Sequence, residues 1–365
     1  MKDVLVYEIA LTRVPGIGTV QAKQLIEHFG DAQQVFQSTK KALAQVDGIG
    51  EIRANAVKSY KDFELAIPEI EFCQKHHIQI LTLWDPAYPQ RLLHCYDAPS
   101  VLFYRGNSNL NNSKIISIIG TRLHTEYGKN ITEQIVADLQ PHQVLIASGL
   151  AFGIDSIAHR AALQQQLPTV GVLAHGLSSI YPKQHKSLAK DMLQQGGLLT
   201  EFGSNVTADK HNFPKRNRIV AGMSDATIVI ETATKGGSMI TAELAYNYNR
   251  DVFAVPGKLT DTKSSGCLRL IQQNKAILFT CTTQLLEELG WQTKKIKAPA
   301  QRSLFVDLTD DEKILVNILQ QKETQPIDVL YLQSGLSSSS VAAAILNLEL
   351  QNVITALPGK MYRLN

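Results

Sequence analysis

Basic side chains gather around one aromatic residue in the segment 203–224, which holds four Lys/Arg, one His and one Asp. Pro214 suits the first turn of a helix, because its ring sets φ and it needs no backbone hydrogen bond there. Arg216 and Arg218 then lie near a helix N-terminus, where N–H groups favour an anion and guanidinium groups fork onto phosphate oxygens. Phe213 offers a face to a nucleic-acid base. The alternative is a solvated basic loop.

The segments around this cluster alternate between two patterns. Apolar runs at 115–119, 144–147, 169–173, 198–201, 226–230 and 252–255 have the composition of buried strands. Helical patterns occupy 126–139, 155–163 and 238–248. This alternation predicts a mostly parallel sheet with right-handed crossovers, whose ligands bind beyond the carboxyl ends of the strands.

Glycines and basic residues fall where these strands end. The groups are Gly120-Thr121-Arg122, Ser148-Gly149, His175-Gly176 with Tyr181-Pro182-Lys183, and Lys235-Gly236-Gly237-Ser238. Such glycines let the backbone approach a phosphate closely, and the regions of Gly149 and Ser238 are expected to offer N–H donors. We therefore predict one phosphate-binding groove surrounded by Arg122, Lys183, Arg216, Arg218 and Lys235.

Signatures of enzymes and nucleotide cofactors are missing. No GxGxxG follows the first strand, since Gly149 and Gly153 are one residue too close, and there is no GxxxxGK[ST]. No catalytic or metal-ligand spacing connects the acidic residues of this region. We expect Asp155 to cap a helix and Glu231 to hold a loop. The sequence predicts no catalytic residue, no cofactor and no metal.

Composition sets wider bounds. A net charge of +3 over 365 residues does not by itself imply a polyanionic partner. The four cysteines are widely spaced without a CxxC pair, which argues against disulfides and zinc and fits a reducing cytosol. No apolar run is long enough to span a bilayer. We expect a cytoplasmic protein of two or three domains.

The first 70 residues contain a duplicated phrase, Val14-Pro15-Gly16-Ile17-Gly18 and Val46-Asp47-Gly48-Ile49-Gly50. Each precedes a helical pattern, so the module resembles a tandem helix-hairpin-helix, which typically grips a DNA backbone. Eight Lys/Arg against nine Asp/Glu make this module slightly acidic. DNA contact and a structural or docking role therefore both remain open.

The end of the chain has a tether and a small third module. Residues 291–307 are basic and are predicted to be a flexible linker. Helical patterns at 309–321, 326–334 and 337–350 precede a hairpin around Pro358-Gly359, an order that resembles a winged helix. The third helix carries no Lys or Arg, whereas a DNA reader needs them there. We expect this module, 308–365, to contact protein or regulate the chain.

Several phrases of the central region together resemble the DNA-processing protein A (DprA/Smf) family. They are Gly120-Thr121-Arg122, SGLAFGIDSIAHRAAL at 148–163, Tyr181-Pro182, FPKRNRIVAG at 213–222, the segment starting GGSMITAEL at Gly236, and Val255-Pro256-Gly257. The resemblance implies an extended Rossmann fold over residues 71–290, following the helix-hairpin-helix (SAM-like) module at 1–70. It implies single-stranded DNA as ligand, a homodimer, and the loading of the recombinase RecA, with displacement of single-strand-binding protein, during natural transformation.

The matching motifs carry over a set of DNA-binding residues. They are Arg122, Gly149, Phe213, Arg216, Asn217 and Arg218, with Lys183, Lys235 and Ser238 added to them. The alternative is a Rossmann-like enzyme that hydrolyses nucleotides, although the PGGxGTxxE signature of the lysine-decarboxylase-like phosphoribohydrolases is absent. A third hypothesis is an adaptor that docks partners through its terminal modules.

Overall fold

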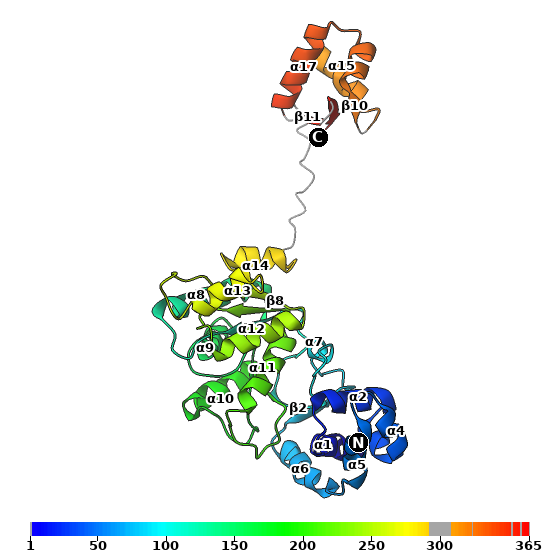
Figure 1. Cartoon of the computed structure of the whole chain (residues 1–365). Coiled ribbons are helices and arrows are strands. Elements are labelled where there is room, and N and C mark those ends of the chain that lie inside the picture. Colours follow the sequence, from blue (N-terminus) through cyan, green and yellow to red (C-terminus); the bar gives the residue numbers. More distant parts are fainter. Residues whose placement is uncertain (1, 292–307, 323, 352, 358–359, 365) are drawn as a thin grey trace. The chain divides into compact units, whose positions relative to one another are not determined.

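The computed structural model describes residues 2–291, 308–322, 324–351, 353–357 and 360–364 (Figure 1). Residues up to 291 form one compact unit and the later residues form a second, and each is described by itself. The predicted linker at 291–307 lies, apart from Trp291, outside the described residues. No helix within these described ranges is long and apolar enough to cross a membrane.

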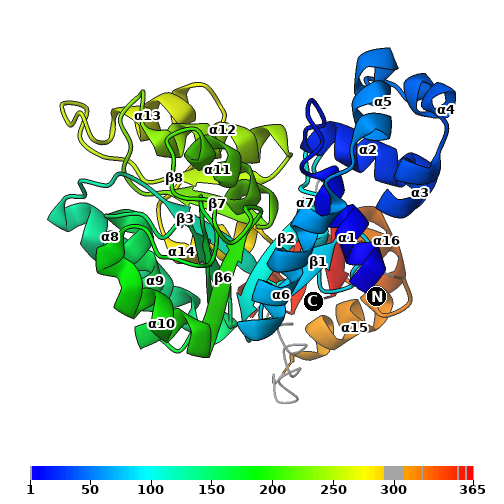
Figure 2. The same ribbon diagram turned by 90° about the horizontal axis from the view of Figure 1, so that it is seen from below.

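A nine-stranded sheet forms the centre of the first unit (Figure 2). Its strands are β1 (Gln79–Thr82), β2 (Val101–Gly106), β3 (Ile115–Ile119), β4 (Leu145–Ser148), β5 (Thr169–Val172), β6 (Gly196–Thr200), β7 (Ala226–Val229), β8 (Asp251–Ala254) and β9 (Ile277–Leu278). They lie in the order β1-β2-β6-β5-β4-β3-β7-β8-β9. All neighbours from β6 to β9 are parallel, which confirms the predicted sheet. Antiparallel β1 and β2 extend one edge.

Helices cover both faces of this sheet (Figure 2). One side carries α8 (Glu126–Leu139), α9 (Ile154–Gln164), α10 (Lys186–Gln195) and α14 (Thr282–Glu288), and the other α7 (Gln90–Leu93), α11 (Asn212–Gly222), α12 (Gly237–Asn247) and α13 (Ser265–Gln272). Successive residues of a strand face opposite sides. Ile116 and Ile118 therefore pack with α8 and α9, while Ile115 and Ile119 pack with α11 and α12.

The chain reverses its progress across the sheet at β3. From β3 it moves outward through β4, β5 and β6, and then it returns to add β7, β8 and β9 on the other side of β3. The connections that follow β3 and β7 therefore diverge at neighbouring strand ends. Open α/β sheets bind their ligands at such a switch point.

The N-terminal helices are α1 (Lys2–Leu11), α2 (Thr19–Phe29), α3 (Ala32–Gln37), α4 (Lys40–Gln45), α5 (Gly50–Ser59) and α6 (Ile67–Lys75). Gly16 and Gly48, one from each copy of the repeated phrase, have φ of 78° and 71°, a conformation that favours glycine. The Arg53 side chain donates to both of their carbonyls, at 3.0 and 2.6 Å. One guanidinium thus ties the two predicted hairpins together. Helix α6 runs across the boundary predicted at residue 70.

Two buried charges fasten these helices to the sheet. The Lys23 Nζ atom in α2 donates to the carbonyls of Leu93 and Cys95, at 2.7 and 2.8 Å. Glu69 in α6 accepts hydrogen bonds from the N–H and hydroxyl of Ser204, at 2.8 and 3.0 Å. Both side chains are buried, and a buried charge without partners is costly. The module is therefore held rigidly at two separate places.

The second unit has the winged-helix order that the sequence predicted. Its helices are α15 (Asp310–Leu319), α16 (Ile327–Ser334) and α17 (Ser338–Leu350), and its strands are β10 (Gln325–Pro326), β11 (Ile354–Leu357) and β12 (Met361–Leu364). The strands form a sheet in the order β10-β12-β11. Pro358 and Gly359, the predicted hairpin turn, lie outside the described residues.

Glu8 in α1 is a buried carboxylate with too few partners. It accepts one long hydrogen bond, from the Ala32 N–H at 3.4 Å, and its Oε2 atom has none from the described residues. Burial raises the pKa of Glu8 from 4.5 to about 7. The folded protein therefore keeps a proton that the unfolded chain releases. The free energy of unfolding then falls as pH rises from 4.5 to about 7, and it levels off above that.

We expect Glu8→Gln to raise the free energy of unfolding by roughly 1–3 kcal/mol at about pH 8, and to change it little near pH 5. Urea unfolding followed by circular dichroism at the two pH values measures both effects. The exposed Glu71→Gln serves as the control. A Glu8→Gln protein no more stable than the wild type at the higher pH contradicts the effect of burial.

Candidate nucleic-acid interface

The carboxyl ends of the central strands enclose a cavity of about 470 Å³, here called the switch-point cavity. Its walls come from residues 119–123 after β3, 149–155 after β4, 232–241 after β7, and helix α11. Six of the predicted site residues line it: Arg122, Gly149, Phe213, Arg216, Asn217 and Ser238. The other three predicted site residues do not line it: Lys183, Arg218 and Lys235.

A cation and two aromatic rings stand at the rim of this cavity. The exposed Arg122 places its guanidinium carbon 5.2 Å from the centre of the Phe213 ring. The Tyr181 ring lies 6.1 Å from the Phe213 ring and is tilted by 55° against it, and Tyr181 is half exposed. A small neighbouring recess shares Arg122, Gly149 and Phe213 with the cavity and ends at Tyr181 and His175. This group of one cation and two aromatic rings suits contacts to phosphates and bases.

Arg216 lies beneath the cavity and is buried. Its guanidinium donates to the Gly149 carbonyl and, at 2.5 Å, to the Val172 carbonyl, and its Nε donates to Asn217 at 3.1 Å. Burial lowers the pKa of Arg216 to about 10, and the neighbouring Asp155 carboxylate opposes that shift. The described contacts of Arg216 tie α11 to the ends of β4 and β5, and its predicted contact with DNA stays a prediction.

Gly149 was predicted to let the backbone approach a phosphate, but in the structure it lets the Arg216 side chain approach the backbone. A Cβ atom at this position would overlap the Arg216 guanidinium. Its N–H donates to the Asp155 carboxylate at 3.2 Å, and the Ala151 N–H donates to the same oxygen at 3.4 Å. Gly149 therefore makes room for a buried arginine, and its N–H already has an acceptor. Burial raises the pKa of Asp155, while Arg216 lowers it.

Arg218 does not face the switch-point cavity. Residues two apart on an α-helix point about 200° apart, so Arg216 and Arg218 cannot reach one groove. The Arg218 guanidinium is buried on the other face of α11, where it pairs with the Glu201 carboxylate and donates to the Asp97 carbonyl. The prediction that all five cations surround one groove is therefore wrong for Arg218.

The two remaining predicted cations are exposed beside the cavity but do not line it. Lys183 begins the short 3₁₀ turn 183–185, directly after Pro182 of the neighbouring recess. Lys235 precedes Gly236, which lines the cavity where α12 begins. Lys183 and Lys235 therefore flank the cavity as exposed positive charges.

Helix α12 presents its N-terminus to the cavity. No side chain caps it, and within the described residues the N–H groups of Gly237 and Ser238 have no acceptor. The Asn217 side chain donates to the Gly237 carbonyl at 3.3 Å and so ties α11 to this turn. Free N–H groups at a helix start bind anions. Of the two predicted donor regions, the one at Ser238 has free N–H groups.

Glu231 and His159, two other ionisable residues of this unit, make contacts within the protein. Glu231 accepts hydrogen bonds from the N–H and hydroxyl of Thr125, so it holds the loop after β3, as expected. His159 contacts the Thr169 hydroxyl at 2.7 Å, and burial lowers the pKa of His159 to about 3. In the described part of the chain, no group of three His, Cys, Asp or Glu could hold a metal ion.

Three known families match the three parts of the chain. The family described as DNA recombination-mediator protein A matches residues 79–290. The DprA winged helix domain matches 297–360, and the SAM-like helix-hairpin-helix tandem matches 8–59. Protein Smf of Synechocystis is 32% identical, over 98% of this chain and 98% of its own length.

The chain belongs to the DNA recombination-mediator protein A family. The resemblance seen in the sequence is confirmed. The X-ray structure of DprA from Streptococcus pneumoniae is 33% identical, with a TM-score of 0.68 over 78% of this chain and 97% of that one. DprA from Helicobacter pylori, whose structure concerns its single-stranded DNA binding mode, is 30% identical, with a TM-score of 0.53 over 59% of this chain and 97% of that one.

Two features of the interface were missed by sequence reasoning on this family member. Tyr181 was noted only as part of a motif, although its ring follows that of Phe213 at the rim. Asp155 was expected to cap a helix, whereas it binds the loop amides above Arg216. The signal in the sequence was the placement of Gly149 and Asp155 six residues apart after a strand. A glycine leaves room for a buried arginine there, and the carboxylate balances its charge.

Because Arg216 is buried and Arg122 is exposed, we expect substitutions of the two residues to change the stability of the protein by different amounts. Arg216→Met should lower the free energy of unfolding by about 3–5 kcal/mol, because it leaves Asp155 buried without its compensating charge. Arg122→Gln should change it by no more than about 0.5 kcal/mol, because this side chain is exposed. Urea denaturation of both variants measures the difference. Equal stability of the two variants contradicts the structural role of Arg216.

Proposed function

We propose that the chain binds single-stranded DNA in the switch-point cavity without reading its sequence. It belongs to a recombination-mediator family. The observation that carries the proposal is the exposed Arg122 beside free helix N–H groups and the neighbouring rings of Phe213 and Tyr181. Contacts of these kinds hold phosphates and stack bases of any sequence. Supporting charge comes from Lys183 and Lys235.

The contacts divide between two parts of the strand. Arg122 and the first turn of α12 bind phosphate oxygens, which are attracted by the guanidinium and by the helix dipole. Phe213 already has Arg122 over its ring, so a base stacks on Tyr181 or on the outer side of the Arg122 guanidinium. Arg216 acts beneath them as a positioning residue, through Gly149.

An enzyme remains the competing hypothesis, and the state of the carboxylates favours binding without turnover. A general base needs an oxygen within reach of a substrate proton. Asp155, the acidic residue that lines the cavity, lies near Arg216 and accepts hydrogen bonds from two backbone N–H groups. Glu231 is occupied by Thr125. Incubation with deoxynucleotides should therefore give no hydrolysis products on chromatography, and steady product formation contradicts the proposal.

We expect Arg122→Ala to weaken single-stranded DNA binding about tenfold or more, since it removes a charged hydrogen bond to phosphate. With three exposed cations, Arg122, Lys183 and Lys235, log affinity should fall against log salt with a slope of about −2. Fluorescence anisotropy with single- and double-stranded oligonucleotides over a salt series measures both. Arg160→Ala, an exposed arginine away from the cavity, is the matched control. An affinity for DNA that does not change with salt, or an equal loss of affinity in Arg122→Ala and Arg160→Ala, contradicts DNA binding at this cavity.

We further propose that the chain acts in the cytoplasm as a homodimer and loads RecA onto DNA coated with single-strand-binding protein. Support for this step comes from membership of the family. In a RecA ATPase assay on coated single strands, the wild-type chain should shorten the lag before ATP hydrolysis, and Arg122→Ala should shorten it less. An unchanged lag with a chain that still binds DNA argues against RecA loading and leaves DNA binding intact.

A further inference from the structure

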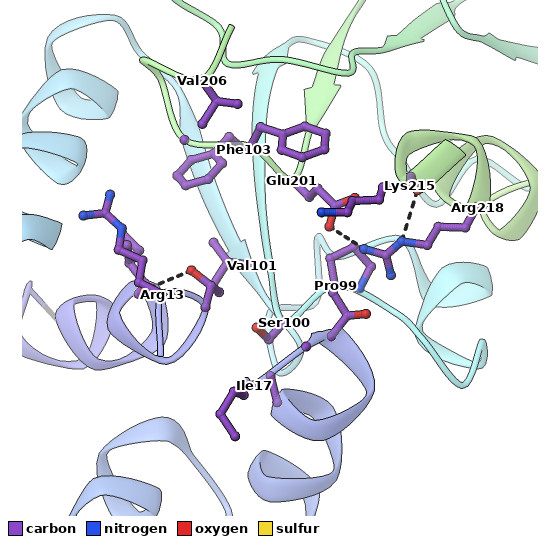
Figure 3. A pocket seen from close by; sticks show the side chains of 17 residues that line it. Arg13, Ile17, Pro99, Ser100, Val101, Phe103, Glu201, Val206, Lys215 and Arg218 are labelled. Atoms are coloured by element: carbon purple, nitrogen blue, oxygen red, sulfur yellow. Dashed lines mark hydrogen bonds and ion pairs between the residues drawn. The ribbon is translucent and has the colours of Figure 1, made fainter. Parts of the chain in front are cut away.

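A second cavity, of about 480 Å³, lies between the N-terminal helices and the sheet (Figure 3). We call it the hairpin cavity, because the first helix hairpin, residues 12–19, forms one side of it. The segment 99–103 leading into β2, the segment 201–206 after β6, and α11 form the rest. Its volume is in the range of pockets that bind small molecules.

The hairpin cavity is preformed. Lys23 binds the carbonyls of Leu93 and Cys95, and Glu69 binds the Ser204 N–H and hydroxyl. These two buried attachments fix the N-terminal helices relative to the sheet, and the cavity lies between the two. A ligand that binds to a preformed pocket loses no binding free energy to ordering the pocket.

Its walls combine an apolar surface with uneven charge. Ile17, Val101 and Phe103 are buried apolar residues of the lining, and Phe202 adds a second ring. The ionisable residues of the lining are three cations and one carboxylate: Arg13, Lys215, Arg218 and Glu201. Figure 3 shows Arg13 across the cavity from the other three.

The charge that faces the cavity is positive and partly unpaired. Glu201 is already paired with Arg218. Lys215 is exposed and makes no ion pair within the described residues. Arg13 donates to the Leu65 carbonyl at 2.6 Å and forms a long ion pair with Glu69, at 4.0 Å. An anion therefore finds one cation of the lining, Lys215, without a close ion pair among the described residues.

We propose that the hairpin cavity is a second binding site of this chain, and that it takes one nucleotide. The flat base fits the apolar side with its two phenylalanines, and the phosphate meets the exposed Lys215. Lys215 and Arg218 face this cavity, whereas Phe213 and Arg216 on the opposite face of α11 line the switch-point cavity. The site is thus separate from the one proposed for DNA. The nucleotide is either free or one unit of a bound strand.

Photolabelling with 8-azido-2′-deoxyadenosine monophosphate tests this site directly. After illumination and digestion, mass spectrometry should find saturable labelling within 99–103 or 202–206, and excess deoxyadenosine monophosphate should prevent it. Lys215→Gln should reduce this labelling roughly tenfold, because it removes a charged contact. Val206→Trp, at the exposed rim, should block it by filling the space. Lys190→Gln, an exposed lysine outside the cavity, should label like the wild type.

The arms of the experiment separate the possible outcomes. Arg122→Ala should keep the labelling even if it loses DNA binding, so failure of the DNA proposal and failure of this one are distinguishable. Displacement of the probe at lower concentrations of deoxyadenosine monophosphate than of an oligonucleotide supports a free ligand, and the reverse order supports a unit of a strand. Three results would overturn the proposal: labelling that does not saturate, labelling that is unchanged in Lys215→Gln and Val206→Trp, or labelling that only an acidic peptide prevents.

Discussion

The burial of the Arg216 guanidinium beneath the loop after β4 is the constraint on which the switch-point cavity depends. This charge is shielded from water, so it must be satisfied internally, and the carbonyls of Gly149 and Val172 do so together with the nearby Asp155. The same contacts join α11 to the ends of two neighbouring strands. They also require a glycine at 149. The floor of the cavity is therefore rigid, and the exposed Arg122 and the start of α12 are left free to meet a ligand.

Helix α11 serves both cavities because its residues divide between two faces. Phe213, Arg216 and Asn217 line the switch-point cavity, while Lys215 and Arg218 line the hairpin cavity. The basic segment that stands out in the sequence is thus not one cationic surface. Two of its charges, Arg216 and Arg218, are buried and hold structure, and Lys215 is exposed on the side away from the proposed DNA site.

Much of the fold could be predicted, because buried parallel strands and amphipathic helices leave strong periodic patterns. The helix predicted at 126–139 is α8, and the strand predicted at 115–119 is β3. Helix α10 was not predicted, although its buried residues Leu188, Ala189 and Met192 have helical spacing. The gathering of Arg122, Gly149 and Ser238 followed from sheet topology. The burial of Arg216 and Arg218 could not be predicted from charge alone, although helical geometry already placed them on opposite faces.

A crystal structure of the chain with a short oligothymidylate tests the central claim most directly. Phosphate oxygens should lie within hydrogen-bond distance of the Arg122 guanidinium and of the N–H groups at the start of α12. Arg216 should keep its bonds to the Gly149 and Val172 carbonyls. A complex in which Arg216 leaves those carbonyls to contact the DNA, or in which the strand avoids Arg122, contradicts the central claim.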